Sequence, residues 1–133
     1  MITNADNPEH WLLLARDRLE KADALFVQFG PSWSGVELLH EAAERFLKAY
    51  LIHHGWELIK THDLSRLLAQ ACSFDPQLAQ FSETTQSLTE QFWEQHYTGG
   101  DLDEVGQDYS ILRESLDEMI ALIEAAIATQ TSH

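Results

Sequence analysis

Cysteine is almost absent from this sequence, which has Cys72 alone among 133 residues. One cysteine excludes an internal disulfide and favours a reducing compartment, so we expect a cytoplasmic protein. The longest apolar runs are only a few residues, too short to cross a bilayer. Residues 1–6 lack the basic region and apolar stretch of a signal peptide.

Positive charge is also scarce, because 8 Lys and Arg stand against 22 Asp and Glu, a net charge of −14. Affinity for a nucleic-acid strand rests on basic residues that release counterions, so this balance disfavours an extended nucleic-acid surface. It is compatible with one small anion site, and it favours a basic protein partner.

Strand patterns and internal repeats are missing, whereas apolar residues recur at helical spacing along the chain. We expect a single all-α domain over residues 1–133, with an ordered core of about 8–128. Four long helices and one short helix would form an antiparallel up-and-down bundle. The long helices are expected at about 9–29, 34–54, 76–97 and from between 101 and 108 to 129, and the short helix follows residue 61.

Capping residues set these boundaries. Asn7 followed by Pro8 predicts the first helix start, and Asp75 followed by Pro76 predicts the fourth. The remaining signals are a capping box of Ser34 with Glu37, a cap at Thr61, stops at Gly30 and Gly55, and a bend between Ser82 and Thr85.

The second helix is predicted to be central, because it has apolar residues on two sides. Val36, Leu39, Ala43 and Phe46 follow one stripe, and a second strip contains Leu38, Ala42 and Ala49. A helix with two apolar faces has neighbours on both.

Catalytic and metal motifs are not found. His40 to Glu44 would need a second His at position 44 for a zinc protease, and Glu37-x-x-His40 occurs once where a di-iron bundle needs two copies. The sequence has no nucleophile elbow and no Gly-rich phosphate loop. We therefore assign no catalytic residue, metal or cofactor, and expect His40 and Glu44 to hydrogen-bond each other or a neighbouring helix.

One polar group favours anion binding. It lies around the second helix and the short helix, and it consists of Lys48, Lys60, His62 and Arg66. Free N–H groups at the start of the short helix could take an anion. The alternative is that these are ordinary surface and capping residues.

Two runs of residues resemble a known family. The first runs from His40 to Leu51 and contains A-A-E-x-x-L-K-A-Y-L; the second is Thr61-His62-Asp63-Leu64. At this separation they resemble the HEPN domain family (higher eukaryotes and prokaryotes nucleotide-binding), over roughly residues 9–127.

The resemblance implies a helical bundle that is often dimeric. Many members are encoded beside a minimal nucleotidyltransferase and were proposed to bind its nucleotide or substrate. Others are ribonuclease toxins that use an Arg, four to six intervening residues and a His. Here no Arg precedes a His at that spacing, and His96-Tyr97-Thr98 stands where many non-toxin members have Arg-Tyr-Pro.

Three interpretations follow. The leading one is a non-catalytic HEPN-type homodimer that binds a nucleotidyltransferase and a nucleotide, in a toxin–antitoxin or stress-related setting, with Lys48, His62, Arg66 and Tyr97 at the nucleotide. The second is a divergent ribonuclease using His96 or His62. The third is a dimerising structural bundle without a small-molecule ligand.

Overall fold

The chain is helical throughout the residues that the structure describes. The computed structural model describes the backbone of residues 6–56, 60–97 and 102–131, and the side chains of residues 6–56, 60–91 and 109–128. The helices are α1 (Pro8–Phe29), α2 (Trp33–His53), α3 (Leu64–Cys72), the 3-10 segment η1 (Pro76–Phe81), α4 (Ser82–Tyr97) and α5 (Leu102–Thr131). None of the helices in these ranges is long and apolar enough to cross a membrane.

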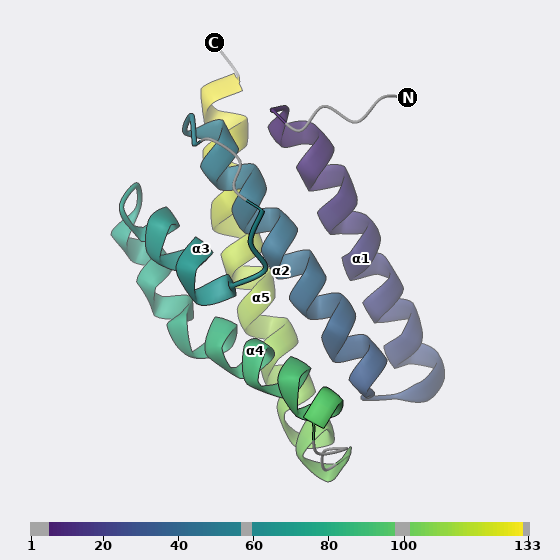
Figure 1. Ribbon diagram of the computed structural model, residues 1–133. Coiled ribbons are helices and arrows are strands. Elements are labelled where there is room, and N and C mark those ends of the chain that lie inside the picture. The colour runs from purple at the N-terminus through teal and green to yellow at the C-terminus, as the bar shows by residue number, and fades with distance from the viewer. Residues whose placement is uncertain (1–5, 57–59, 98–101, 132–133) are drawn as a thin grey trace.

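The long helices alternate in direction, as predicted. α1, α2, α4 and α5 run up and down in turn, so α1 begins and α5 ends at the same end of the bundle (Figure 1). The short helix α3 lies in the connection between α2 and α4 and packs against both. The all-α, up-and-down prediction is therefore confirmed.

The central position of α2 follows from its two apolar sides. It packs against α1, α3, α4 and α5. Residues of both predicted strips are buried, including Leu39, Phe46, Ala42 and Ala49. Three polar side chains in the middle of this helix, those of His40, Glu44 and Lys48, are consequently buried as well.

The other predicted stripes also form the core. On α5, every member of the stripe Tyr109, Leu112, Leu116, Met119, Ile120, Ile123 and Ile127 is buried. On α3 the buried residues are Leu64, Leu67, Leu68 and Ala71. On α4, the side chains of Phe92 and Trp93 lie outside the described residues.

The start of α2 corrects the predicted capping box. Ser32, not Ser34, is the N-cap, and its Oγ accepts a hydrogen bond of 3.0 Å from the Gly35 N–H. The backbone is extended at Ser32, with φ −152° and ψ 158°, whereas Ser34 already lies inside the helix. A cap must be the last non-helical residue, so the match of Ser34 with Glu37 to the capping-box pattern was misleading.

The start of α3 corrects a second cap. Asp63 caps the helix through Oδ1, which accepts from the Arg66 N–H at 3.3 Å. Thr61 lies before the cap, and its Oγ1 accepts from the Asp63 N–H at 3.2 Å. A carboxylate at this position also interacts favourably with the positive end of the helix dipole, which favours Asp63 over Thr61 as the cap.

The fourth predicted helix is divided in two. Asp75 caps the chain as expected, but residues from Pro76 to Phe81 form η1, and α4 begins at Ser82. Short hydroxyl side chains bond to nearby carbonyls here, from Ser82 to Ala79 at 2.8 Å and from Thr85 to Ser82 at 3.0 Å. Such local bonds compete with regular helix and account for the change of geometry.

Candidate functional site

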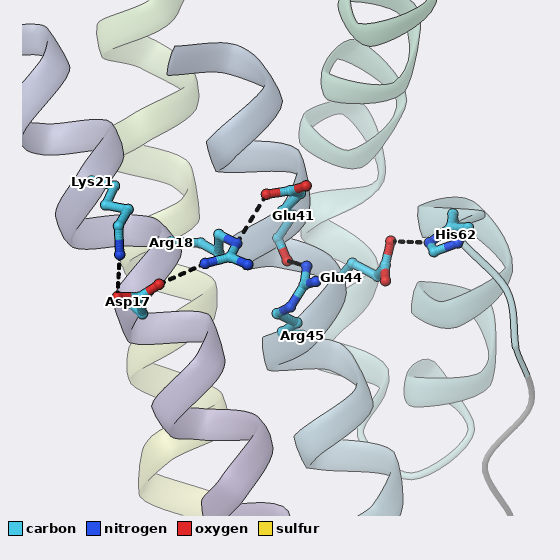
Figure 2. A network of polar contacts seen from close by, with 7 residues as sticks. All are labelled: Asp17, Arg18, Lys21, Glu41, Glu44, Arg45 and His62. Atoms are coloured by element: carbon cyan, nitrogen blue, oxygen red, sulfur yellow. Dashed lines mark hydrogen bonds and ion pairs between the residues drawn. The ribbon is translucent and has the colours of Figure 1, made fainter. Parts of the chain in front are cut away.

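A buried carboxylate on α2 organises the most polar part of the interior. Glu44 is only 4% exposed, yet both of its oxygens have partners. Oε2 accepts from Lys48 Nζ at 2.9 Å, one turn along the same helix. Oε1 lies 2.9 Å from His62 Nδ1, in the connection that precedes α3 (Figure 2).

Lys48 is buried together with Glu44. It is 5% exposed, and its Nζ lies 5.4 Å from the centre of the Trp11 ring on α1. A buried ammonium needs a carboxylate partner, and the face of an indole adds an attractive cation–π contact. Lys48 therefore holds Glu44 in place, and it does not project into solvent.

The charge state of Glu44 follows from these contacts. Burial acts to raise the pKa of this carboxyl, but hydrogen bonds from Lys48 and His62 outweigh burial, so its pKa is lowered. Glu44 is thus an ionised acceptor at neutral pH. His62 must then donate from Nδ1, because the carboxylate carries no proton to give.

His40 lies one turn before Glu44 on α2 and is 4% exposed. Burial lowers the pKa of its imidazole, the nearby Glu44 opposes that effect, and His62 adds to it. His40 is consequently neutral at pH 7. We call His40, Glu44, Lys48 and His62 the Glu44 cluster; with His62 neutral, its charges sum to zero.

His62 connects this interior to the surface. Its side chain is 86% exposed, although its Nδ1 edge is held by a buried carboxylate. The second nitrogen, Nε2, lies on the opposite side of the ring and faces solvent. A fixed imidazole with one accessible nitrogen can bind an anion when protonated, or transfer a proton.

A second polar network joins α1 to α2, and carboxylates in it pair with Arg18 and Lys21. Arg18 pairs with Asp17 at 2.6 Å and with Glu41 at 3.1 Å, and Lys21 also pairs with Asp17 (Figure 2). Arg45 donates to the Glu41 carbonyl at 3.1 Å. The Arg18–Glu41 pair joins the two helices. Carboxylates balance the charges of Arg18 and Lys21, whereas Arg45 bonds a neutral carbonyl and keeps its charge.

The remaining basic side chains are unevenly distributed. Carboxylate pairs hold Arg16, Arg18, Lys21, Lys48 and Arg113. Lys60 and Arg66 are exposed, and neither side chain has a hydrogen bond or ion pair within the described residues. Arg45 also lacks a carboxylate partner among the described residues, but it donates to the Glu41 carbonyl. Lys60 and Arg66 both lie within four residues of His62, so two exposed cations flank the exposed histidine.

The predicted site residues have different placements. Lys48 and His62 are brought together by Glu44, Lys48 below the surface and His62 on it. Arg66 is exposed in the first turn of α3. Tyr97 is the last residue of α4, and both its side chain and that of His96 lie outside the described residues.

Glu44 is the centre of this polar cluster, and it was not identified as such from the sequence. It was expected to bond His40 or a neighbouring helix, and the i, i+4 spacing of Glu44 and Lys48 was available as a signal. The bond to His62 is made instead to the connection before α3, not to a helix. Cys72 is half-buried. Within the described ranges no three His, Cys, Asp or Glu residues are grouped to hold a metal.

The structure is thus a helical bundle with a polar cluster at the start of its short helix. The chain matches the model of the HEPN domain over residues 8–129. It therefore belongs to the HEPN family. Searches of curated proteins and of solved structures return no match.

Proposed function

We propose that this chain is a non-catalytic HEPN module that binds a nucleotide and a nucleotidyltransferase partner. The observation that carries the nucleotide part is the pair of uncommitted cations, Lys60 and Arg66, on either side of the fixed His62. A phosphate group needs cationic donors that are not already neutralised. Lys60 and Arg66 offer such donors beside His62 among the described residues.

The partner part rests on charge and on family. A net charge of −14 gives the molecule a negative field that attracts a basic protein surface. Exposed acidic residues such as Glu114 and Glu118 on α5 contribute to it. Binding of this kind weakens as salt is added, because the charges involved are exposed.

We also propose that the protein forms a homodimer through the end of α1. Phe26, Val27 and Phe29 are exposed there, Val27 by 86% and Phe29 by 67%. The same half of α1 contributes Leu25 to an apolar groove of about 330 Å³ that Leu38 of α2 also lines. Exposed apolar surface is typical of protein contacts.

The nucleotide part is tested by titration calorimetry with ATP and GTP. We expect saturable binding that is lost in the double variant Lys60→Ala/Arg66→Ala. Lys21→Ala is the matched control, because it removes an exposed lysine that is already paired with Asp17. Binding that survives the double variant, or no binding by the parent protein, would overturn the nucleotide part.

The other two parts need separate measurements. The mass in solution should be that of a dimer, and Val27→Asp should make it monomeric. A minimal nucleotidyltransferase encoded beside this chain should co-purify with it at low salt and dissociate at high salt. A monomeric parent protein would overturn the dimer, and no co-purification would overturn the partner.

One observation favours RNA cleavage as a second candidate. Glu44 holds Nδ1 of His62 and leaves Nε2 accessible, which is the arrangement of an oriented general base. If this candidate is correct, the purified protein cleaves RNA and His62→Ala abolishes the cleavage. Unchanged cleavage in that variant would exclude His62 as the base.

A further inference from the structure

We propose that the site recognises the dianionic terminal phosphate of a mononucleotide, and that His62 binds it as an imidazolium held from behind by Glu44. This inference rests on the nucleotide binding proposed above and makes it specific. It assigns the class of ligand and the protonation state of the protein, neither of which follows from nucleotide binding alone.

The first step is the geometry of His62. A protonated imidazole has two N–H donors on opposite sides of the ring. One points to Glu44 Oε1 at 2.9 Å, and the other is directed to solvent, where the side chain is 86% exposed. A phosphate oxygen at Nε2 would therefore complete a chain from phosphate to imidazolium to buried carboxylate.

The second step is the balance of charges that face His62. From α2, Glu44 favours a proton on the ring, Lys48 opposes it while sharing the other oxygen of Glu44, and His40 is neutral. On its own segment and at the start of α3, the positive charges of Lys60 and Arg66 disfavour a proton on His62. The Asp63 carboxylate, which accepts from the Arg66 backbone N–H, favours one. A bound phosphate dianion neutralises Lys60 and Arg66 and thereby favours the protonated ring.

The third step concerns the number of charges and oxygens in the ligand. Lys60, Arg66 and protonated His62 supply three donor groups and three positive charges. A terminal phosphate offers three oxygens and about two negative charges above its second pKa of roughly 6. A phosphodiester offers two free oxygens and one charge, so it leaves part of this donor set unused.

The fourth step excludes a long strand. Each further phosphate of an RNA chain would meet an acidic surface, since the molecule has a net charge of −14 and five of its eight basic side chains are paired with carboxylates. Strand binding depends on neutralising many phosphates at once. The site is suited to one phosphate group.

Lys48 is a positioning residue in this proposed site. It is 5% exposed and bonded to Glu44, so it reaches the phosphate only through Glu44 and His62. Lys60 and Arg66 would contact the phosphate directly.

The test is titration calorimetry of the full chain at slightly alkaline pH, in two buffers with different heats of ionisation. Proton uptake is read from the difference in heat between the buffers. We expect uptake when AMP or ATP binds, and weaker binding of 3′,5′-cyclic AMP, which has only a diester. His62→Gln should abolish the uptake and weaken AMP binding about tenfold or more, as for loss of a charge-assisted hydrogen bond.

The outcomes separate the two proposals. Nucleotide binding without proton uptake, or equal affinity for AMP and cyclic AMP, overturns this inference and leaves the proposed function standing. No binding of any nucleotide overturns both. His62 is exposed, so His62→Gln is expected to fold, and an unchanged circular dichroism spectrum checks this. Lys60→Ala gives a second, independent loss of affinity, with proton uptake retained.

Discussion

Glu44 and His62 share a 2.9 Å hydrogen bond between two residues that differ greatly in exposure and lie 18 positions apart in the chain. Glu44 belongs to the central helix, and His62 to the connection before α3. The bond therefore ties an exposed segment to the core through a single buried carboxylate. The expected consequences concern stability, pH dependence and the state of the imidazole.

Removing Lys48 should be strongly destabilising. Lys48→Met leaves the ionised Glu44 buried without its ammonium partner, and breaking a buried ion pair costs about 3–5 kcal/mol. The free energy of unfolding is measured by urea denaturation. The double variant Glu44→Leu/Lys48→Met should recover most of the loss, because a well-packed apolar pair replaces both charges. A loss below about 1 kcal/mol in Lys48→Met would mean that the pair acts like a surface salt bridge.

Stability should fall on mild acidification. His40 has a lowered pKa in the folded protein, mainly because it is buried, so below its ordinary value of 6.5 the unfolded chain binds more protons than the folded one. The free energy of unfolding should therefore decrease as pH falls through 6.5 toward the folded pKa. Replacing His40 by Gln should reduce this slope, and an unchanged slope would contradict the assignment.

A second loss should follow in stronger acid. The pKa of Glu44 is also lowered, below its ordinary value of 4.5, so its contribution to stability is complete above that value and is lost as pH falls through the folded pKa. In Glu44→Gln this second loss should disappear. The two variants thus separate the two pH ranges in one series of unfolding measurements.

The helix cap gives a test that is independent of the cluster. Ser32→Ala removes the side chain that accepts from the Gly35 N–H and should cost about 1 kcal/mol of unfolding free energy. Ser34→Ala is the matched control, because Ser34 is exposed inside the first turn, and it should stay within about 0.5 kcal/mol. Urea denaturation of both variants is the measurement. A larger loss of unfolding free energy in Ser34→Ala than in Ser32→Ala would contradict the Ser32 cap and support a capping box at Ser34.

Much of the fold could be predicted because helical spacing is a local signal. The stripe from Tyr109 to Ile127 follows from the positions of its apolar residues, and all of its members are buried. The position of the cap was harder to predict, since Ser32 and Ser34 have the same side chain and lie two residues apart. Backbone geometry decides between them, and the sequence does not specify it.

The candidate site was predictable only in part, for a related reason. The spacing of Glu44 and Lys48 places both on one face of a helix, so that contact is readable from the sequence. The contact between Glu44 and His62 depends on how the connection after α2 returns along the bundle. The lack of partners for Lys60 and Arg66 among the described residues likewise depends on the positions of the carboxylates, which are known only once the helices are packed.

Nitrogen NMR of the His62 imidazole, before and after addition of ATP, reports which of its two nitrogens carries a proton. We expect Nδ1 of the free protein to carry the proton that is directed at Glu44, and Nε2 to gain a proton when ATP binds. A free ring protonated on Nε2, or an imidazole spectrum unchanged by ATP at concentrations that bind, would contradict this expectation.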